Sequence, residues 1–168
     1  MDNKICEMFF STIDLSQTRV VHTYLPIERR IEVNTYPIIK RLTEDFPSTR
    51  LVVPYTIMSD HSLKHLYWKQ GEVLIENKWG IPEPDPISNE EASVQDIDIV
   101  IVPLMAYDLM GHRVGYGAGF YDRFLADCRD ETLIVGLSHF APEDQWIKSE
   151  EYDIDLDWCI MADKVYKF

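Results

Sequence analysis

Four of the seven glycines in this chain lie within nine residues, between an apolar run and a segment with helical spacing. They are Gly111, Gly115, Gly117 and Gly119, preceded by the apolar run at residues 97–102 and followed by the helix-patterned residues 120–128. Glycine adopts backbone conformations closed to other residues and lets a ligand approach the main chain closely. A strand, a glycine-rich loop and a helix in this order present backbone N–H groups to a phosphate. The pattern therefore predicts an anion-binding loop on a strand-and-helix scaffold.

Short apolar runs and helix-patterned segments alternate along the rest of the chain. We expect strands at residues 19–25, 51–54, 61–68, 71–75, 97–102, 132–137, 158–161 and 165–168, and helices at 3–12, 35–46 and 120–128. Near-continuous apolar strands separated by helices are typical of a parallel sheet covered on both faces. The expected fold is therefore α/β, with three α/β/α layers and a mainly parallel sheet. Residues 79–96, rich in proline and acidic residues, are expected to cross the surface as a loop, and Thr35 is expected to cap the second helix.

The composition restricts the possible partners. The 168 residues suit one domain, and a net charge of −13 provides no basic footprint for nucleic acid. An acidic protein that binds an anion must do so locally, with backbone amides and a few arginines or a metal ion. Cys6, Cys128 and Cys159 form no paired pattern, which indicates a reducing, cytoplasmic location. No apolar stretch approaches the length of a membrane span, and the oligomeric state is not predicted.

Two charged residues flank the glycines and make the loop chemically specific. Arg113 can pair with phosphate oxygens in a forked geometry. Asp122, in the first turn of the next helix, can hold Mg²⁺ against the same phosphates. A second interpretation is open at this point: a structural turn, with Arg113 in a surface ion pair and Asp122 favoured by the helix dipole.

The order of residues from Pro103 to Arg123 resembles a family signature. It contains Ala106, Asp108 and Gly111, then Arg113-Val-Gly-Tyr-Gly-Ala-Gly-Phe-Tyr-Asp-Arg123, and so is similar to P-x-x-A-F-D-x-x-G-x-R-L-G-x-G-x-G-Y-Y-D-R of 5-formyltetrahydrofolate cyclo-ligases, also called methenyltetrahydrofolate synthetases. Further matches lie before this stretch, at residues 24–26 and 79–84, and after it, at residues 135–137 and 153–157, in the same order as in the family. The resemblance therefore covers residues from about Ile5 to Tyr166. It implies one domain over residues 1–168, on a scaffold like that of sugar-phosphate isomerases and CoA transferases.

The resemblance also implies an activity. Such enzymes use ATP and Mg²⁺ to convert 5-formyltetrahydrofolate to 5,10-methenyltetrahydrofolate, releasing ADP and phosphate. Phosphorylation turns the formyl oxygen into a leaving group, and the folate nitrogen at position 10 then attacks the activated carbon. Catalysis then depends on positioning and charge stabilisation.

Site residues carry over from the family by position. The nucleotide would contact Arg113, Val114, Gly115, Tyr116, Gly117, Ala118, Gly119, Phe120 and Tyr121, of which Arg113 and Tyr121 would be catalytic. The formyl-folate would contact Leu25, Glu32, Met58, Trp79, Tyr116, Gly117, Ala118, Gly119 and Phe120, and Mg²⁺ would bind Asp122 and Asp153. Without the resemblance, Asp153 would be read as part of a solvated acidic face, and Trp79 as a core residue.

One departure from the family keeps an alternative open. Family members begin with a basic helix carrying K-x-x-x-R, whereas here Met8 stands four residues after Lys4. We therefore expect the domain to lack that helix. Three explanations are open: a shortened form of a working enzyme, another Lys or Arg in that role, or a catalytically impaired relative that binds folate or nucleotide. A sugar-phosphate isomerase or acyl-CoA transferase-like enzyme on a similar scaffold is a further, weaker hypothesis.

Overall fold

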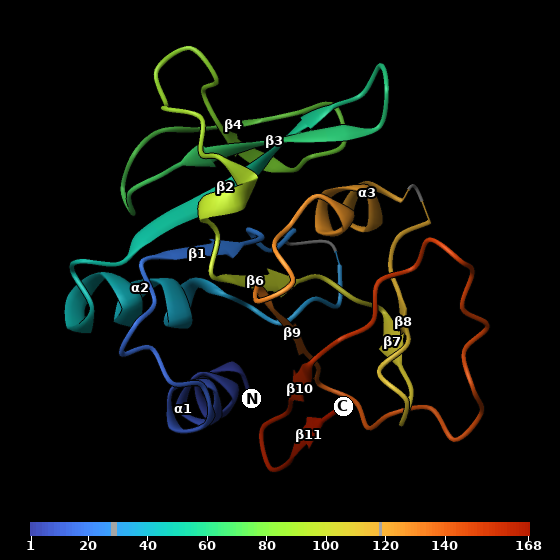
Figure 1. Ribbon diagram of the computed structural model, residues 1–168. Helices are drawn as coiled ribbons and strands as arrows, with labels where there is room; N and C mark the ends of the chain where they lie inside the picture. Colours follow the sequence, from blue (N-terminus) through green and yellow to red (C-terminus); the bar gives the residue numbers. More distant parts are fainter. Residues whose placement is uncertain (28–29, 118) are drawn as a thin grey trace.

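The computed structural model describes residues 1–27, 30–117 and 119–168. Within these ranges it contains a seven-stranded sheet in the order β11-β10-β9-β6-β1-β2-β3 (Figure 1). The strands are β1 (Val20–Thr23), β2 (Arg50–Ile57), β3 (Ser62–Tyr67), β6 (Ile99–Val102), β9 (Leu133–Leu137), β10 (Trp158–Ile160) and β11 (Val165–Lys167). The five inner strands are parallel to one another, while the edge strands β3 and β11 run antiparallel to them. The mainly parallel sheet is therefore confirmed.

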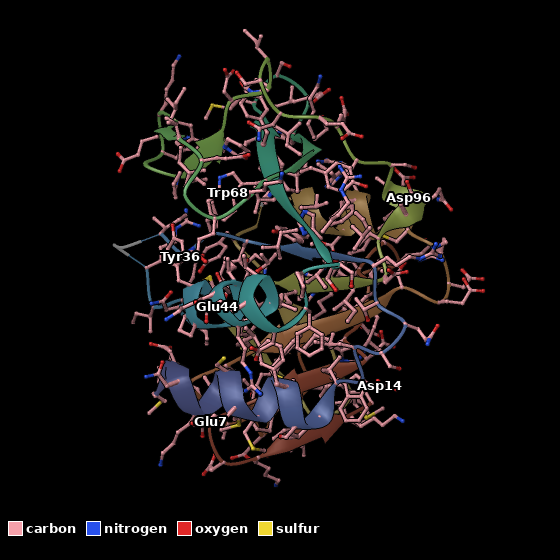
Figure 2. The ribbon with its side chains drawn as sticks, turned by 90° about the vertical axis from the view of Figure 1, so that its left-hand side faces the viewer. Glu7, Asp14, Tyr36, Glu44, Trp68 and Asp96 are labelled. Atoms are coloured by element: carbon pink, nitrogen blue, oxygen red, sulfur yellow. The ribbon has the colours of Figure 1, made fainter. Side chains whose placement is uncertain are left out.

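Helices cover both faces of this sheet, so the three-layer prediction is also confirmed. Helices α1 (Asp2–Thr12) and α2 (Tyr36–Asp45) lie together over one face, and α3 (Phe120–Ala126) lies over the other (Figures 1 and 2). No helix among the described residues is long and apolar enough to cross a bilayer.

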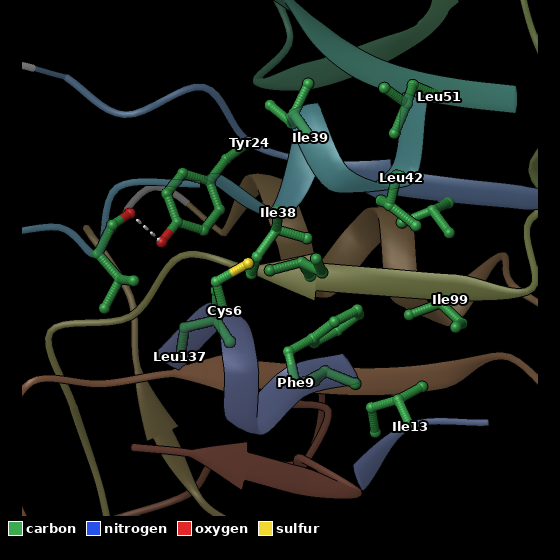
Figure 3. Close-up of a cluster of buried hydrophobic side chains, with 14 of the residues drawn as sticks. Cys6, Phe9, Ile13, Tyr24, Ile38, Ile39, Leu42, Leu51, Ile99 and Leu137 are labelled. Carbon is green, nitrogen blue, oxygen red and sulfur yellow. Dashed lines mark hydrogen bonds between the residues drawn. The ribbon is translucent and has the colours of Figure 1, made fainter. Parts of the chain in front are cut away.

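Alternation along the strands produces one core on each face. In β6, Ile99 and Ile101 pack with residues of α1 and α2. Val100 and Val102 of the same strand pack with Phe124 of α3 on the opposite face. Figure 3 shows the first of these cores, in which α1 and α2 residues meet strand residues. Because successive strand residues point to opposite faces, a strand covered on both sides needs an uninterrupted apolar run.

Thr35 precedes α2 as expected, but it has a different role from the one predicted. Its side chain makes no capping hydrogen bond; the hydroxyl instead donates to the backbone oxygen of Tyr24 at 2.8 Å. Tyr24 in turn donates its phenol to the Val33 carbonyl at 2.8 Å, drawn as a dashed line in Figure 3. These two bonds join the last part of the loop, at Val33 and Thr35, to its first residue, Tyr24, which directly follows β1.

Two small hairpins include segments that were expected to be loops. Strand β4 (Leu74–Glu76) overlaps the strand expected at residues 71–75, but its partner β5 (Pro82–Pro84) lies inside the stretch predicted as a surface crossing. A short 3-10 helix, η1 (Val94–Asp96), ends that stretch. Strand β7 (Ala106–Tyr107) pairs with β8 (Arg113–Val114), so a hairpin follows β6; Gly111 lies in its turn and the other three glycines come after it. The helix after the glycines is also shorter than predicted, since α3 ends at Ala126.

Candidate functional site

A cavity of about 750 Å³ opens beside the carboxyl ends of β1 and β6. Tyr24 and Leu25, which follow β1, and Pro103, which follows β6, form part of its wall. Ligands in open α/β sheets bind in the crevice outside the carboxyl ends of the strands, so the position of the cavity is the expected one. Further lining residues come from the loop after β1, from β2 and β3, from the β4–β5 hairpin, from the glycine-rich segment with the start of α3, and from the loop that contains Ile147, Lys148 and Asp153.

Most of the predicted site residues share this one cavity. Those that line it are Leu25, Glu32, Trp79, Arg113, Val114, Gly115, Tyr116, Gly117, Gly119, Phe120, Tyr121, Asp122 and Asp153. Met58 instead lines a smaller neighbouring pocket, which shares Thr56 with the main cavity. Ala118 lies outside the described residues. Lys4 is exposed on α1 and is not among the described residues of the lining.

The backbone conformation favours glycine at two positions of the loop. Gly117 and Gly119 have φ angles of +86° and +68°, in the left-handed region that side chains with a Cβ seldom adopt. No heavy atom lies within 4 Å of the position that a Cβ would take on Gly117. This part of the main chain is therefore open to the cavity that it borders.

Arg113 and Asp122 form a largely buried ion pair, unlike the surface pair that the structural interpretation of the loop would require. The Arg113 Nη2 atom lies 2.5 Å from Asp122 Oδ1, and the Arg113 side chain is only 4% exposed. The Nε atom of Arg113 is buried with no hydrogen-bond partner among the described residues. A buried donor without a partner is costly, so an acceptor on a bound ligand would stabilise this guanidinium.

Tyr121 supplies a second unpartnered group. Its phenol oxygen is buried and has no hydrogen-bond partner in the described part of the chain. Burial raises the pKa of Tyr121, and the negative charge of Glu32 raises it further. The phenol therefore remains a neutral hydrogen-bond donor at physiological pH.

Glu32 and Tyr116 meet at another part of the wall. Glu32 Oε2 accepts a hydrogen bond from the Ile27 backbone N–H at 2.9 Å. The Arg30 guanidinium carbon lies 4.0 Å from the centre of the Tyr116 ring, a cation–π distance. Burial and the interaction with Glu32 raise the pKa of Tyr116. Arg30 and Glu32 thus hold the loop at residues 30–32 against the glycine-rich segment.

Aromatic rings form the apolar wall. Phe120 lies edge-on to Trp79, with ring centres 6.2 Å apart, and edge-on to His61 at 5.6 Å. Arg123 donates to the His61 carbonyl at 3.0 Å, which ties α3 to the turn between β2 and β3. The buried carboxylate of Glu83 accepts from the Thr56 N–H at 2.9 Å and anchors the β4–β5 hairpin to β2.

Asp108 joins two parts of the site that are distant in sequence. This fully buried carboxylate accepts hydrogen bonds from the backbone N–H groups of Met110, His112 and Ile147 at 2.9–3.1 Å, and lies 2.9 Å from His112 Nδ1. Burial alone would raise the pKa of Asp108, but these hydrogen bonds bring it below its ordinary value. Asp108 therefore fixes the hairpin that carries Arg113 against the segment that carries Ile147 and Lys148.

Sequence reasoning missed several lining residues, among them Arg30, Ile147 and Lys148. Ile147 and Lys148 lie in an irregular loop without a motif. Their one sequence signal is a lysine beside a run of acidic residues. Arg30 lies in the same polar loop as Glu32, where a charged residue is ordinarily solvated.

Asp122 and Asp153 line the same cavity, and each has a carboxylate oxygen that could serve as a metal ligand. Asp122 Oδ1 accepts from the Ile154 N–H at 3.3 Å, and Asp153 Oδ2 accepts from the Glu150 N–H at 2.8 Å. Among the described residues, the second oxygen of each carboxylate accepts no hydrogen bond, and no group of three or more His, Cys, Asp or Glu residues is arranged to hold a metal. Two carboxylates suit an ion that takes its remaining ligands from phosphates and water.

The comparisons with known proteins agree with one another. Residues 2–161 match the model of the 5-formyltetrahydrofolate cyclo-ligase family. The protein named 5-formyltetrahydrofolate cyclo-ligase from Escherichia coli (strain K12) is 31% identical over 138 residues, covering 82% of this chain and 75% of the relative. Its counterpart from Haemophilus influenzae is 27% identical over 158 residues, covering 92% of this chain and 82% of the relative.

Two solved structures have a similar fold. The NMR structure of Aquifex aeolicus 5,10-methenyltetrahydrofolate synthetase matches with a TM-score of 0.73 and 24% identity, over 99% of this chain and 80% of that one. The 5,10-methenyltetrahydrofolate synthetase from Mycoplasma pneumoniae matches with a TM-score of 0.72 and 21% identity, over 95% and 84%. At these identities the likeness shows the fold alone.

Proposed function

This chain belongs to the 5-formyltetrahydrofolate cyclo-ligase family, and we propose that it converts 5-formyltetrahydrofolate to 5,10-methenyltetrahydrofolate with ATP, releasing ADP and phosphate. One observation carries the proposal. Most of the residues that the family signature relates to nucleotide, folate and metal border a single cavity of about 750 Å³. Two substrates that must exchange a phosphoryl group have to lie in contact, and one shared cavity allows this.

Each substrate has matching groups in the lining. Glu32 accepts N–H groups of the pterin ring, while Leu25, Trp79 and Phe120 contact its apolar faces. Arg113 and the glycine-rich main chain hold the nucleotide phosphates. The unpartnered Arg113 Nε and Tyr121 hydroxyl donate to oxygens of the bound substrates, which removes the penalty for leaving them unpaired.

The reaction has two steps. The formyl oxygen first takes the terminal phosphoryl group of ATP, so a new P–O bond forms as the bond to ADP breaks. The nitrogen at position 10 then attacks the formyl carbon, the bond from that carbon to its phosphorylated oxygen breaks, and phosphate leaves carrying the nitrogen's proton. Arg113 and Tyr121 stabilise charge on the transferred group without changing their own covalent bonds.

Asp122 and Asp153 are the residues that would hold Mg²⁺. The ion would neutralise charge on the phosphate oxygens when bound. Asp122 also orients Arg113 through their ion pair, so this carboxylate links the metal position to the guanidinium.

A coupled turnover assay tests the proposal. Purified protein is mixed with Mg·ATP and 5-formyltetrahydrofolate, and methenyl absorbance and ADP are followed together. We expect one ADP for each methenyl group formed, and no product when ATP is omitted. A folded protein that forms no product refutes the proposed activity; calorimetry showing folate binding without ATP hydrolysis would then favour the catalytically impaired relative.

An arginine variant connects the activity to this cavity. We expect Arg113→Met to lower kcat/KM at least about thirtyfold, because losing one partner of a buried charge pair costs about 2 kcal/mol or more. Arg41→Met is the matched control, since Arg41 pairs with Asp45 at 3.1 Å on the exposed face of α2. Equal activity in both variants would show that the reaction takes place elsewhere.

A further inference from the structure

The charges around the cavity are unevenly distributed. Its lining contains three carboxylates, Glu32, Asp122 and Asp153, and three cations, Arg30, Arg113 and Lys148. Arg30 lies over Tyr116, beside Glu32. Arg113 is already paired with Asp122, so without Lys148 the part of the wall around Asp122 and Asp153 carries a net charge of −1. Such a wall repels a polyphosphate unless cations balance it, and Lys148 would add to the charge of the Mg²⁺ ion proposed above.

Lys148 is held at this wall through its own backbone. The N–H of its neighbour Ile147 donates to the buried Asp108 at 2.9 Å. On the other side, the Glu150 N–H donates to Asp153, and the Ile154 N–H donates to Asp122. The segment at residues 147–154 is therefore attached to other parts of the site at two points, through Ile147 and Ile154, while the Glu150–Asp153 bond lies within the segment. Among the described residues, the long side chain of Lys148 pairs with Glu150.

The partner of Lys148 can be exchanged. Lys148 Nζ lies 2.6 Å from Glu150 Oε1, and the two side chains are 85% and 66% exposed. Ion pairs this exposed contribute little to stability. Glu150 does not line the cavity, whereas Lys148 does. A phosphate entering the cavity therefore competes with a weak partner for a cation that is already in place.

We propose that Lys148 binds the phosphates of the nucleotide and releases Glu150 when it does so. This inference rests on the proposed function and names a phosphate ligand outside the family signature. It also assigns Asp108 a positioning role, because Asp108 holds the backbone next to Lys148 at the cavity.

The test compares two lysine variants in two assays. We expect Lys148→Met to raise the KM for ATP about tenfold, the effect of losing one charge-assisted contact, and to leave the KM for 5-formyltetrahydrofolate within about twofold. Calorimetric titration with a non-hydrolysable ATP analogue and Mg²⁺ measures the same loss without turnover. Lys40→Met is the matched control, because Lys40 pairs with Glu44 at 3.9 Å, and the two side chains are 64% and 61% exposed, on α2.

Glu150→Gln tests the exchange in the opposite direction. Removing the competing carboxylate should lower the KM for ATP, and this variant keeps Lys148 in place. An unchanged or raised KM in Glu150→Gln, or equal effects of Lys148→Met and Lys40→Met, overturns the inference, as does a parallel rise in the KM for both substrates.

The proposed activity and the proposed Lys148 contact can be refuted independently of each other. If wild-type protein turns over and Lys148→Met binds ATP normally, the Lys148 inference is overturned and the activity stands. If turnover is absent but the variant still binds the analogue about tenfold more weakly, the activity is refuted and the phosphate contact stands. If the wild type neither turns over nor binds the analogue, both are overturned.

Discussion

The stability of this protein should fall on mild acidification because of a histidine that the proposed reaction does not use. His65 of β3 is 6% exposed, and its ring centre lies 4.0 Å from that of Phe124 and 5.2 Å from that of His22. Burial lowers the pKa of His65 from 6.5 to about 4, although the charges of Glu91 and Asp127 act to raise it. Burial also places the pKa of His22 well below 6.5, with a further contribution from His65.

Proton binding at His65 determines how the contribution of this residue to the free energy of unfolding changes with pH. Between pH 6.5 and about 4 the unfolded chain binds a proton at His65 that the folded chain does not, so acid favours unfolding in that window. Above pH 6.5 His65 is neutral in both the folded and the unfolded state, so its protonation no longer lowers the free energy of unfolding. At pH 5.5 the unfolded histidine is about ten-elevenths protonated and the folded one almost neutral, which corresponds to about 1.4 kcal/mol.

His65→Phe isolates this contribution. Urea unfolding of both proteins at pH 8.0 and pH 5.5 measures the loss of stability in each, and the lower pH stays above the isoelectric point of about 4.7. We expect the wild type to lose about 1.4 kcal/mol more than the variant, or about 0.7 M in urea midpoint at an m-value of about 2 kcal/mol/M. Equal losses would mean that His65 is solvated in the folded state, and the reasoning from burial would be wrong.

Two substitutions at other positions give further predictions. A Cβ at Gly136 would lie 2.6 Å from Leu104 Cδ2 and 2.9 Å from Leu156 Cδ1. Gly136→Ala should therefore lower the free energy of unfolding by about 1–2 kcal/mol and the Tm by about 3–6 °C in a thermal melt. An unchanged Tm would refute the predicted overlap. Tyr121→Phe should lower kcat about tenfold without lowering the Tm, because it removes a buried hydroxyl that has no partner among the described residues. The exposed Tyr152→Phe is its control, and equal kcat values in the two variants would remove Tyr121 from the reaction.

The layers of the fold were predictable because they depend on local patterns. An apolar run such as Ile99–Val102 can be buried on both faces only in a central strand, and Ile38, Ile39 and Leu42 repeat at the spacing of one helix face. These signals lie within one element each. The edge strands β3 and β11 were expected as strands, but their antiparallel direction was not, since direction depends on which strand pairs with which.

The wrong prediction of a Thr35 cap and the failure to predict the β7–β8 hairpin have a common physical origin. Thr35 has the right residue type for a cap, but its hydroxyl bonds to the Tyr24 carbonyl, eleven residues earlier in the chain. The β7–β8 hairpin holds only two residues in each strand, too few to produce an alternating pattern. In both places a tertiary contact decided the structure, and local propensity is a weak guide there.

The sequence predicted the glycines, Arg113 and Asp122 as residues of one site because the proposed phosphate-binding role would need those residue types close together. Lys148 was not, because the contact that brings its segment to the cavity joins Asp108 to Ile147, 39 residues apart. A buried carboxylate with four hydrogen-bonding partners tolerates little displacement, so the hairpin with Arg113 and the loop with Lys148 should move as one unit. The two cations nearest the acidic pair would then keep a fixed spacing, as two ligands of one phosphate chain require.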